Sequence, residues 1–250
     1  MNNPNPVATY ALRLGDNGLV LAQRLGAWCG HAPELEIDLA LANIGLDLLG
    51  QARNFLSYAA ELNGCGDEDT LAFGRDERQY SNLLLVEQPN GNFADTIARQ
   101  FFIDVWHVAL FSRLVNSRDA QLAAIAAKGL KEVRYHQRLA AAGWSVSVTA
   151  PNYQIAKCSK RSTICGASPA NCSSLMKWSS AWLSRALRLI RVNCRPNGKA
   201  RYTRRFSTPA YRSRRSGLPL RRQTGLHSEH LGPLLAEMQY LQRSHPGLQW

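Results

Sequence analysis

The sequence lacks acidic residues over a long stretch. None of residues 133–228 is Asp or Glu, although this stretch holds 19 of the 30 Lys and Arg residues. Residues 1–132, by contrast, contain 16 acidic and ten basic residues. The net charge of +12 therefore averages an acidic body and a strongly basic segment. Between Arg201 and Arg222 the arginines alternate with aromatic residues, a composition typical of segments that bind nucleic acid or another polyanion.

Other absences exclude whole classes of protein. No run of about 18 apolar residues is present, so no membrane-spanning helix is expected. The first residues have neither the basic start nor the apolar core of a signal peptide, so we expect a cytoplasmic protein whose six cysteines remain thiols. Cys158, Cys165, Cys172 and Cys194 are too widely spaced for a structural zinc site. No phosphate-binding glycine loop or nucleophile elbow appears.

The remaining sequence reads as long helices with short connections. Asp16 and Asn17 are expected to cap a helix over 19–30, and Glu34 and Glu36 to open a second over 34–62. Further helices are expected over 93–118, 120–143 and 225–243. Four long helices with short connections predict an all-α, ferritin-like bundle. The predicted inward residues are Ile37, Leu41, Ile44, Leu48 and Phe55, widened by Leu35, Leu39, Leu46, Leu49 and Leu56; Ile97, Phe101, Val105 and Ala109; and Leu231, Leu234, Leu235, Met238 and Leu241.

Polar residues interrupt these apolar faces. Ferritin-like di-iron proteins place a Glu on each of two helices and a Glu-x-x-His pair on each of the other two. The nearest equivalents are Asp47 with Gln51, Asp104, and Glu132 with His136. These five residues are candidates for a vestigial metal site.

Two interpretations of these residues remain open. In one, Asp47, Asp104, Glu132 and His136 bind two iron ions. In the other, which we favour, they are hydrogen-bonded polar residues in a bundle without metal. The positions three after Asp47 and Glu132, where histidines are required, hold Gly50 and Tyr135. The first helix offers only Gln23, and buried carboxylates would take donors from Arg24, Arg53, Arg134 or His136.

Three other groups of polar residues are given structural roles. His107 is expected to be a hydrogen-bonded histidine of the bundle rather than a ligand. The segment 227–230, with sequence HSEH, is expected to start a helix and to lie at the surface. Cys29 and Cys65 are expected to be thiols without a function.

Three continuous segments carry a resemblance to a known family. They are WCGHAPELEIDLALANIGLDLLGQARNFLSYAAEL at 28–62, DERQYSNLLLVEQPNGNFADTIARQ at 76–100, and GLHSEHLGPLLAEMQYLQR at 225–243. Together they resemble the structural C subunit of the bacterial multicomponent phenylacetyl-CoA epoxidase. The resemblance covers about 10–143 and 225–250, and its motifs are long and therefore specific.

The resemblance implies a function as part of a complex. It implies a ferritin-like subunit, without cofactor or catalytic residues of its own, that pairs with a homologous catalytic A subunit, which bears the di-iron centre. It further implies a reductase that supplies electrons from NADPH through flavin and an iron–sulfur cluster. No specific nucleic-acid or membrane partner is expected. The alternatives are a di-iron oxygenase in its own right and a polyanion binder acting through 201–222.

Residues 144–224 depart from this resemblance. Length is kept there, but Asp and Glu disappear while Arg, Ser and Cys rise. A reading-frame slip near 144, restored near 225, would leave this pattern. We therefore expect one ferritin-like domain over 1–250, with bundle helices in 1–143 and 225–250 and an atypical segment over 144–224.

Overall fold

The computed structural model describes residues 5–64, 66–149 and 227–246. Within these ranges the regular structure is entirely helical, as the sequence predicts. The long helices are α1 (Pro6–Gly26), α2 (Leu35–Asn63), α4 (Phe93–Leu114) and α5 (Ala120–Thr149). Shorter elements are α3 (Glu68–Phe73), the 3₁₀ turn η1 (Glu77–Gln79) and α8 (Leu231–Ser244). No helix in the described ranges is both long and apolar enough to cross a bilayer.

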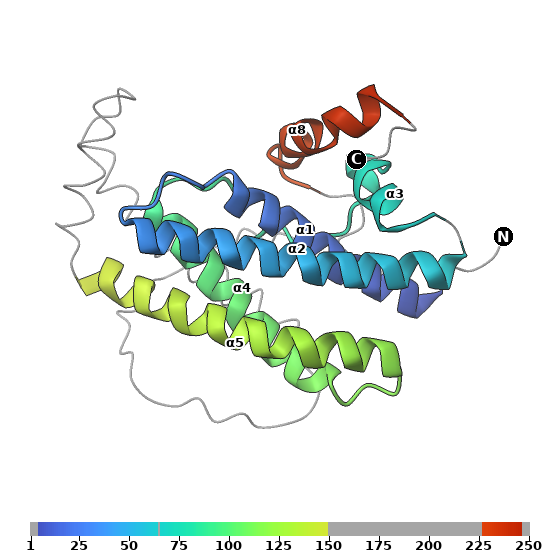
Figure 1. Cartoon of the computed structure of the whole chain (residues 1–250), viewed down its shortest axis with the longest axis horizontal. Helices are drawn as coiled ribbons and strands as arrows, with labels where there is room; N and C mark the ends of the chain where they lie inside the picture. Colours follow the sequence, from blue (N-terminus) through green and yellow to red (C-terminus); the bar gives the residue numbers. More distant parts are fainter. Residues whose placement is uncertain (1–4, 65, 150–226, 247–250) are drawn as a thin grey trace, which may run out of the picture.

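Two helical hairpins form the bundle. Helix α1 packs along α2, α4 packs along α5, and the hairpins meet where α2 contacts α5 (Figure 1). The close approach of α1 and α2 depends on small residues, because a Cβ at Gly18 would lie 2.9 Å from the carbonyl oxygen of Leu48. One apolar cluster joins α1 and α2 to α4 and α8, and a second joins them to α4 and α5.

The first helix begins earlier than predicted. Its N-cap is Asn5, whose side chain accepts from the Val7 amide, and Pro6 takes the first helical position. The prediction that Asp16 and Asn17 cap this helix is therefore wrong. Both are buried in the middle of α1, where Asp16 pairs with Arg75 and Asn17 accepts from the Leu83 amide. They attach the loop after α3 to the bundle.

The inward face of α4 is also different from the prediction. Ile97 is buried, but Phe101, Val105 and Ala109 are only partly buried. The buried face carries polar residues instead, together with Phe102, Ile103 and Phe111; these polar residues are Thr96, Arg99, Gln100, Asp104 and His107. The face of α4 with more apolar residues was predicted to be buried, and this is wrong because α4 turns its polar face towards the centre of the bundle.

Helix α8 lies on the side of the α1–α2 hairpin away from α5 (Figure 1). Leu231, Leu234 and Leu235 are buried there, and Met238 packs against the same cluster. Leu241 was predicted to face inward and is instead exposed. The same correction applies to four leucines of α2, namely Leu35, Leu39, Leu46 and Leu49. Helix α5 continues to Thr149, past Gly143 where the sequence pattern changes. The predictions for residues 150–224, including the basic stretch at 201–222, lie outside the described residues.

Candidate functional site

The candidate site is the polar centre between α2, α4 and α5. The structure brings four of the five candidate residues together, since Asp47 bonds His136 and Gln51 bonds Glu132. The fifth, Asp104, bonds Gln100 on the buried face of α4, which also carries His107; Gln100 and His107 are two residues that the sequence analysis did not select. We call the following set the bundle centre: Asp47 and Gln51 on α2; Gln100, Asp104 and His107 on α4; and Glu132 and His136 on α5. Of these, Gln100, Asp104 and His136 are completely buried.

The side chains from α2 and α5 bond to each other in pairs. The Nε2 atom of His136 lies 2.9 Å from Oδ2 of Asp47. The amide of Gln51 donates to Oε2 of Glu132 at 2.7 Å. His136 is thus the donor that Asp47 required, as one interpretation of the sequence expected. Arg24 and Arg53, which were also proposed as donors, bond elsewhere: Arg24 donates to backbone carbonyls, and Arg53 pairs with Glu68 at the surface.

The side chains from α4 are less well bonded. Gln100 donates from Nε2 to Oδ1 of Asp104 at 2.8 Å. In the described part of the chain, four buried atoms of the bundle centre have no hydrogen-bond partner: Oε1 of Gln100, Oδ2 of Asp104, and Nδ1 of both His107 and His136. The expectation that His107 is a fully bonded histidine is therefore wrong at Nδ1; its ring stacks on Phe111.

Burial controls the protonation of this region. It raises the pKa of Asp104 well above its usual value, against the opposing effect of the Gln100 bond. It lowers the pKa of His107 to about 3, with a further contribution from nearby His136. Burial also lowers the pKa of His136, although Asp47 opposes that shift. Burial therefore favours the uncharged forms of both Asp104 and His107.

This chemistry does not fit a di-iron site. Iron ligands must be ionised carboxylates and unprotonated imidazole nitrogens that face a common point. Here Asp47 and His136 bond to each other, and so do Glu132 and Gln51. Among the described residues, no group of three or more His, Cys, Asp or Glu is arranged to hold a metal ion. Gln23, the only polar candidate on α1, lies at a pocket beside α8 rather than in the centre.

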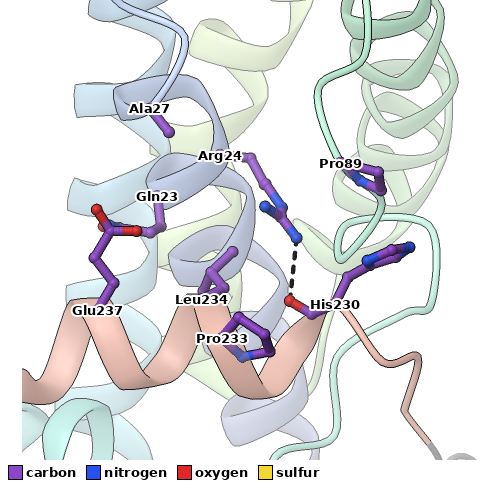
Figure 2. Close-up of a pocket in the computed structure, with 8 residues that line it drawn as sticks. All are labelled: Gln23, Arg24, Ala27, Pro89, His230, Pro233, Leu234 and Glu237. Carbon is purple, nitrogen blue, oxygen red and sulfur yellow. Dashed lines mark hydrogen bonds between the residues drawn. The ribbon is translucent and has the colours of Figure 1, made fainter.

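This pocket is a second candidate site. It has a volume of about 180 Å³ and lies between α1, the loop at Pro89 and α8 (Figure 2). The guanidinium of Arg24 donates to the carbonyl of His230 at its edge, and the side chain of Glu237 borders the other side. The pocket is open and small, and its Arg24 already donates to the carbonyls of Glu87 and His230. Arg24 therefore holds the start of α8 in place, and the pocket is not a substrate site.

A third polar region lies next to the pocket and was misread from the sequence. We call it the Glu87 cluster: the buried carboxylate of Glu87 accepts from His227, from Asn82, and from both the amide and the hydroxyl of Ser228. The other ring nitrogen of His227 bonds the carbonyl of Tyr80. The segment 227–230 does precede a helix, as predicted, but the prediction that it lies at the surface is wrong for the buried side chain of His227 and for Ser228, which bonds the buried Glu87.

The Glu87 cluster fixes its own charges. Burial alone would raise the pKa of Glu87, but the donors from His227 and Ser228 outweigh it and keep this pKa below its usual value. Burial would likewise lower the pKa of His227, but Glu87 and the Tyr80 carbonyl reverse the shift and raise it. Both ring nitrogens face acceptors, so the ring is an imidazolium. The role is structural: it attaches the segment before α8 to the loop before α4.

Gln100 and His107 are the functional-region residues that the sequence analysis did not select. Their spacing gave a usable signal, since residues 100, 104, 107 and 111 share one face of a helix. Cys29, by comparison, is an exposed free thiol, as expected.

Comparison with known proteins agrees with the resemblance seen in the sequence. The model of the family PaaA_PaaC, described as phenylacetic acid catabolic protein, matches residues 2–149. A curated relative, the C subunit of 1,2-phenylacetyl-CoA epoxidase from Escherichia coli K12, is 56% identical over an alignment of 262 residues. That alignment covers 98% of this chain and 100% of the relative. The chain, with its all-α bundle, therefore belongs to the family of phenylacetic acid catabolic proteins.

Proposed function

We propose that this chain is the non-catalytic structural subunit of a phenylacetyl-CoA epoxidase complex in aerobic phenylacetate degradation. It pairs with a homologous subunit that carries the di-iron centre and binds the acyl-CoA. A reductase supplies that centre with electrons from NADPH through flavin and an iron–sulfur cluster. High identity to the C subunit of such an epoxidase, over the whole of that relative, supports the assignment.

One observation carries the non-catalytic part of the proposal. The groups that a di-iron site would use are instead bonded to one another, Asp47 to His136 and Glu132 to Gln51. Each carboxylate on α2 and α5 thereby has a donor supplied by the opposite helix. Such pairs connect the two hairpins without a metal: the completely buried His136 finds its acceptor in the partly exposed Asp47, and the buried Gln51 finds its acceptor in the partly buried Glu132.

A second function, a di-iron oxygenase in its own right, has one observation in its favour. Oδ2 of Asp104 and Nδ1 of His107 and His136 lack partners, and such atoms are potential metal ligands. It is the weaker candidate, because Asp47 and Glu132 already bond His136 and Gln51, and because burial raises the pKa of Asp104 and so disfavours the ionised carboxylate that a metal needs. It predicts about two iron ions per chain.

The test of the first proposal is assembly. The full chain is co-expressed with a homologous di-iron subunit and purified through a tag on that subunit. We expect a stable complex in which epoxidation of phenylacetyl-CoA needs both chains. Activity of the di-iron subunit with undiminished rate and stability in the absence of this chain would contradict the structural role.

We further infer that residues 144–224 reflect a reading-frame slip. The family model matches only up to residue 149, and the chain beyond the segment again bonds to the bundle, with Ser228 donating to Glu87 and Gln239 of α8 donating to the carbonyl of Arg75. Reading GC-rich codons one base out of frame yields Arg, Ser and Cys and removes Asp and Glu. Resequencing the gene and translating its other frames tests this. An acidic, helical continuation in another frame is expected, and its absence in all frames would refute the inference.

A further inference from the structure

Charged side chains are divided unevenly over the surface of the bundle. Within the described residues, every exposed Asp and Glu lies on α2, α3, η1 or α8, or on a residue next to one of these elements. Between 93 and 143, by contrast, every exposed charged side chain is Lys or Arg. These basic residues are Arg113, Arg118, Lys128, Lys131, Arg134 and Arg138. The α4–α5 hairpin therefore presents positive charge that no exposed carboxylate of the hairpin offsets.

Four of these cations follow one line along α5. We call Lys128, Lys131, Arg134 and Arg138 the basic stripe; they are separated by three, three and four residues. Residues three or four apart share a helix face, so the four side chains lie on one face of α5. The basic stripe spans about 15 Å, since each helical residue advances about 1.5 Å. Helix α5 lies on the side of the bundle away from α8 (Figure 1).

The chain itself offers no carboxylate to the basic stripe. In the described ranges none of its four residues forms an ion pair. Glu132, the acidic residue of α5, accepts from Gln51, and Asp119 at the start of α5 accepts from Tyr58. Residues 1–4, 65, 150–226 and 247–250 contain neither Asp nor Glu, so they supply no acidic side chain either. The complementary negative charge must come from another molecule.

We propose that the basic stripe is the face on which this subunit docks an acidic surface of the electron-donating reductase. This inference rests on the proposed function, which supplies a reductase as partner. Exposed charges steer an oppositely charged protein into place, but each pair adds little affinity because water and salt screen it. Such a contact suits a protein that must bind and leave during every turnover. Electron-transfer partners accordingly meet over small interfaces.

Shape and charge favour a protein over other anionic partners. The outer face of a helix is convex, so it does not enclose a small anion such as phosphate. A nucleic acid or a lipid surface is an extended polyanion, and the acidic body of residues 1–132 would repel it beyond the basic stripe. A protein with a local acidic patch meets the stripe alone. Tyr135, 46% exposed on the same face, adds an aromatic contact of the kind enriched at protein interfaces.

Charge reversal in the basic stripe tests the proposal. The complex of the full chain with the di-iron subunit is assayed with phenylacetyl-CoA and NADPH while the reductase concentration is varied. Lys131→Glu combined with Arg138→Glu is expected to raise the KM for the reductase at least about tenfold at low salt and to leave kcat unchanged, because only docking is affected. At about 1 M salt, where the Debye length is about 3 Å, the variant and the parent complex should have similar KM values.

Two control variants change the net charge by the same amount. Arg13→Glu with Arg78→Glu alters exposed cations on α1 and η1, and Arg204→Glu with Arg205→Glu alters the basic stretch at 201–222. Both are expected to keep the KM for the reductase within about twofold of the parent value. An equal rise of KM in either control would show that general charge, or the basic stretch, binds the reductase, and would overturn the proposal.

A carbodiimide cross-link, which joins a lysine amine to a carboxylate in contact with it, locates the reductase directly. Links from Lys128 to the reductase are expected by mass spectrometry, and links only from lysines outside the stripe would contradict the docking face. If the stripe variant no longer co-purifies with the di-iron subunit, the stripe belongs to that interface and the proposal is wrong. If the variant assembles and keeps the parent KM, the docking face is wrong while the proposed function stands. If the parent complex does not epoxidise phenylacetyl-CoA at all, both fail.

Discussion

The Glu87 cluster and the bundle centre are both buried and polar, yet they are built differently. The Glu87 carboxylate accepts from four donor groups, and the His227 ring uses both nitrogens. In the bundle centre each carboxylate has one donor from a protein side chain, and four buried atoms have none. The first region fixes a loop and a helix on the bundle; the second leaves hydrogen-bonding capacity unused.

The difference indicates how each region contributes to stability. A network of a buried charge and several donors stabilises the fold only while every member is present. Removal of one member leaves the others buried without a hydrogen-bond partner or counter-charge. A buried group without a partner already lowers stability. The Glu87 cluster should therefore be intolerant of substitution, whereas the bundle centre should tolerate conversion to apolar or neutral residues. Tolerance of such substitutions is expected where the polar residues have no catalytic role.

The largest effect is predicted at Glu87. Glu87→Leu leaves the His227 imidazolium buried without its counter-charge and should lower the free energy of unfolding by about 3–5 kcal/mol. Urea denaturation measures the change. Glu77→Gln is the control, because Glu77 is an exposed carboxylate whose charge also helps raise the pKa of His227, and its loss should cost less than about 0.5 kcal/mol. Equal effects of the two variants would show that the Glu87 cluster is not the anchor described above.

The next effect is a pH dependence at His107. Because its folded pKa is about 3 and its unfolded pKa about 6.5, folding requires the unprotonated ring. Stability is therefore lost as pH falls from 6.5 towards 3, and at pH 4.5 the His107 contribution should amount to about 2–3 kcal/mol. His107→Leu should remove this part of the slope, whereas exposed His31→Gln should retain it. An unchanged slope in the His107 variant would contradict its buried, neutral state.

A smaller effect is predicted at Asp104. Its raised pKa means that the folded state keeps a proton that the unfolded chain releases above about pH 4, so stability falls as pH rises through this range. Asp104→Asn preserves the shape and the acceptor for Gln100, and because an amide has no proton to lose, the variant should be at least as stable as the parent chain at pH 7 and should lack that fall. Asp119→Asn should instead remove stability that is present above about pH 4, because bonds from the Leu122 amide and the Tyr58 hydroxyl lower the pKa of Asp119. A loss as large as that of Glu87→Leu would place Asp104 with the anchoring residues.

The smallest effect is predicted on the exposed face of α2. Leu46→Glu should change the unfolding free energy of the isolated chain by no more than about 0.5 kcal/mol, because the side chain is 65% exposed. Thermal or urea unfolding of the chain without a partner measures it. A loss above about 1.5 kcal/mol would show that Leu46 packs within the chain.

The sequence predicted the helices better than their faces. Helices α2, α4 and α5 follow from long apolar periodicity, and their predicted N-terminal starts lie within a residue of the observed ones. The start of α1 was missed, because the short polar side chains of Asp16 and Asn17 resemble a cap until Arg75 and Leu83, some 60 residues later, are known to bind them. A pairing so distant along the chain leaves no local pattern.

The faces were harder because apolar residues lie on both sides of α2. Ile44 and Leu46 are equally apolar, and only the position of α1 decides which is buried. On α4 the spacing of Ile97, Phe101, Val105 and Ala109 suggested one inward face, while the buried Asp104 and His107 occupy another. The sequence did place Asp47, Gln51, Glu132 and His136 in one region, since their helices and spacing suffice for that. It did not predict their pairing, which depends on the register between α2 and α5.

Iron content tests the central claim most directly. The full chain is incubated anaerobically with ferrous iron, desalted and analysed for metal, beside the same treatment of the homologous di-iron subunit. The account predicts no stoichiometric iron on this chain, because Asp47 bonds His136, Glu132 bonds Gln51, and burial disfavours the ionised form of Asp104. About two tightly held iron ions per chain would contradict it and make this polypeptide an oxygenase subunit instead of a partner for one.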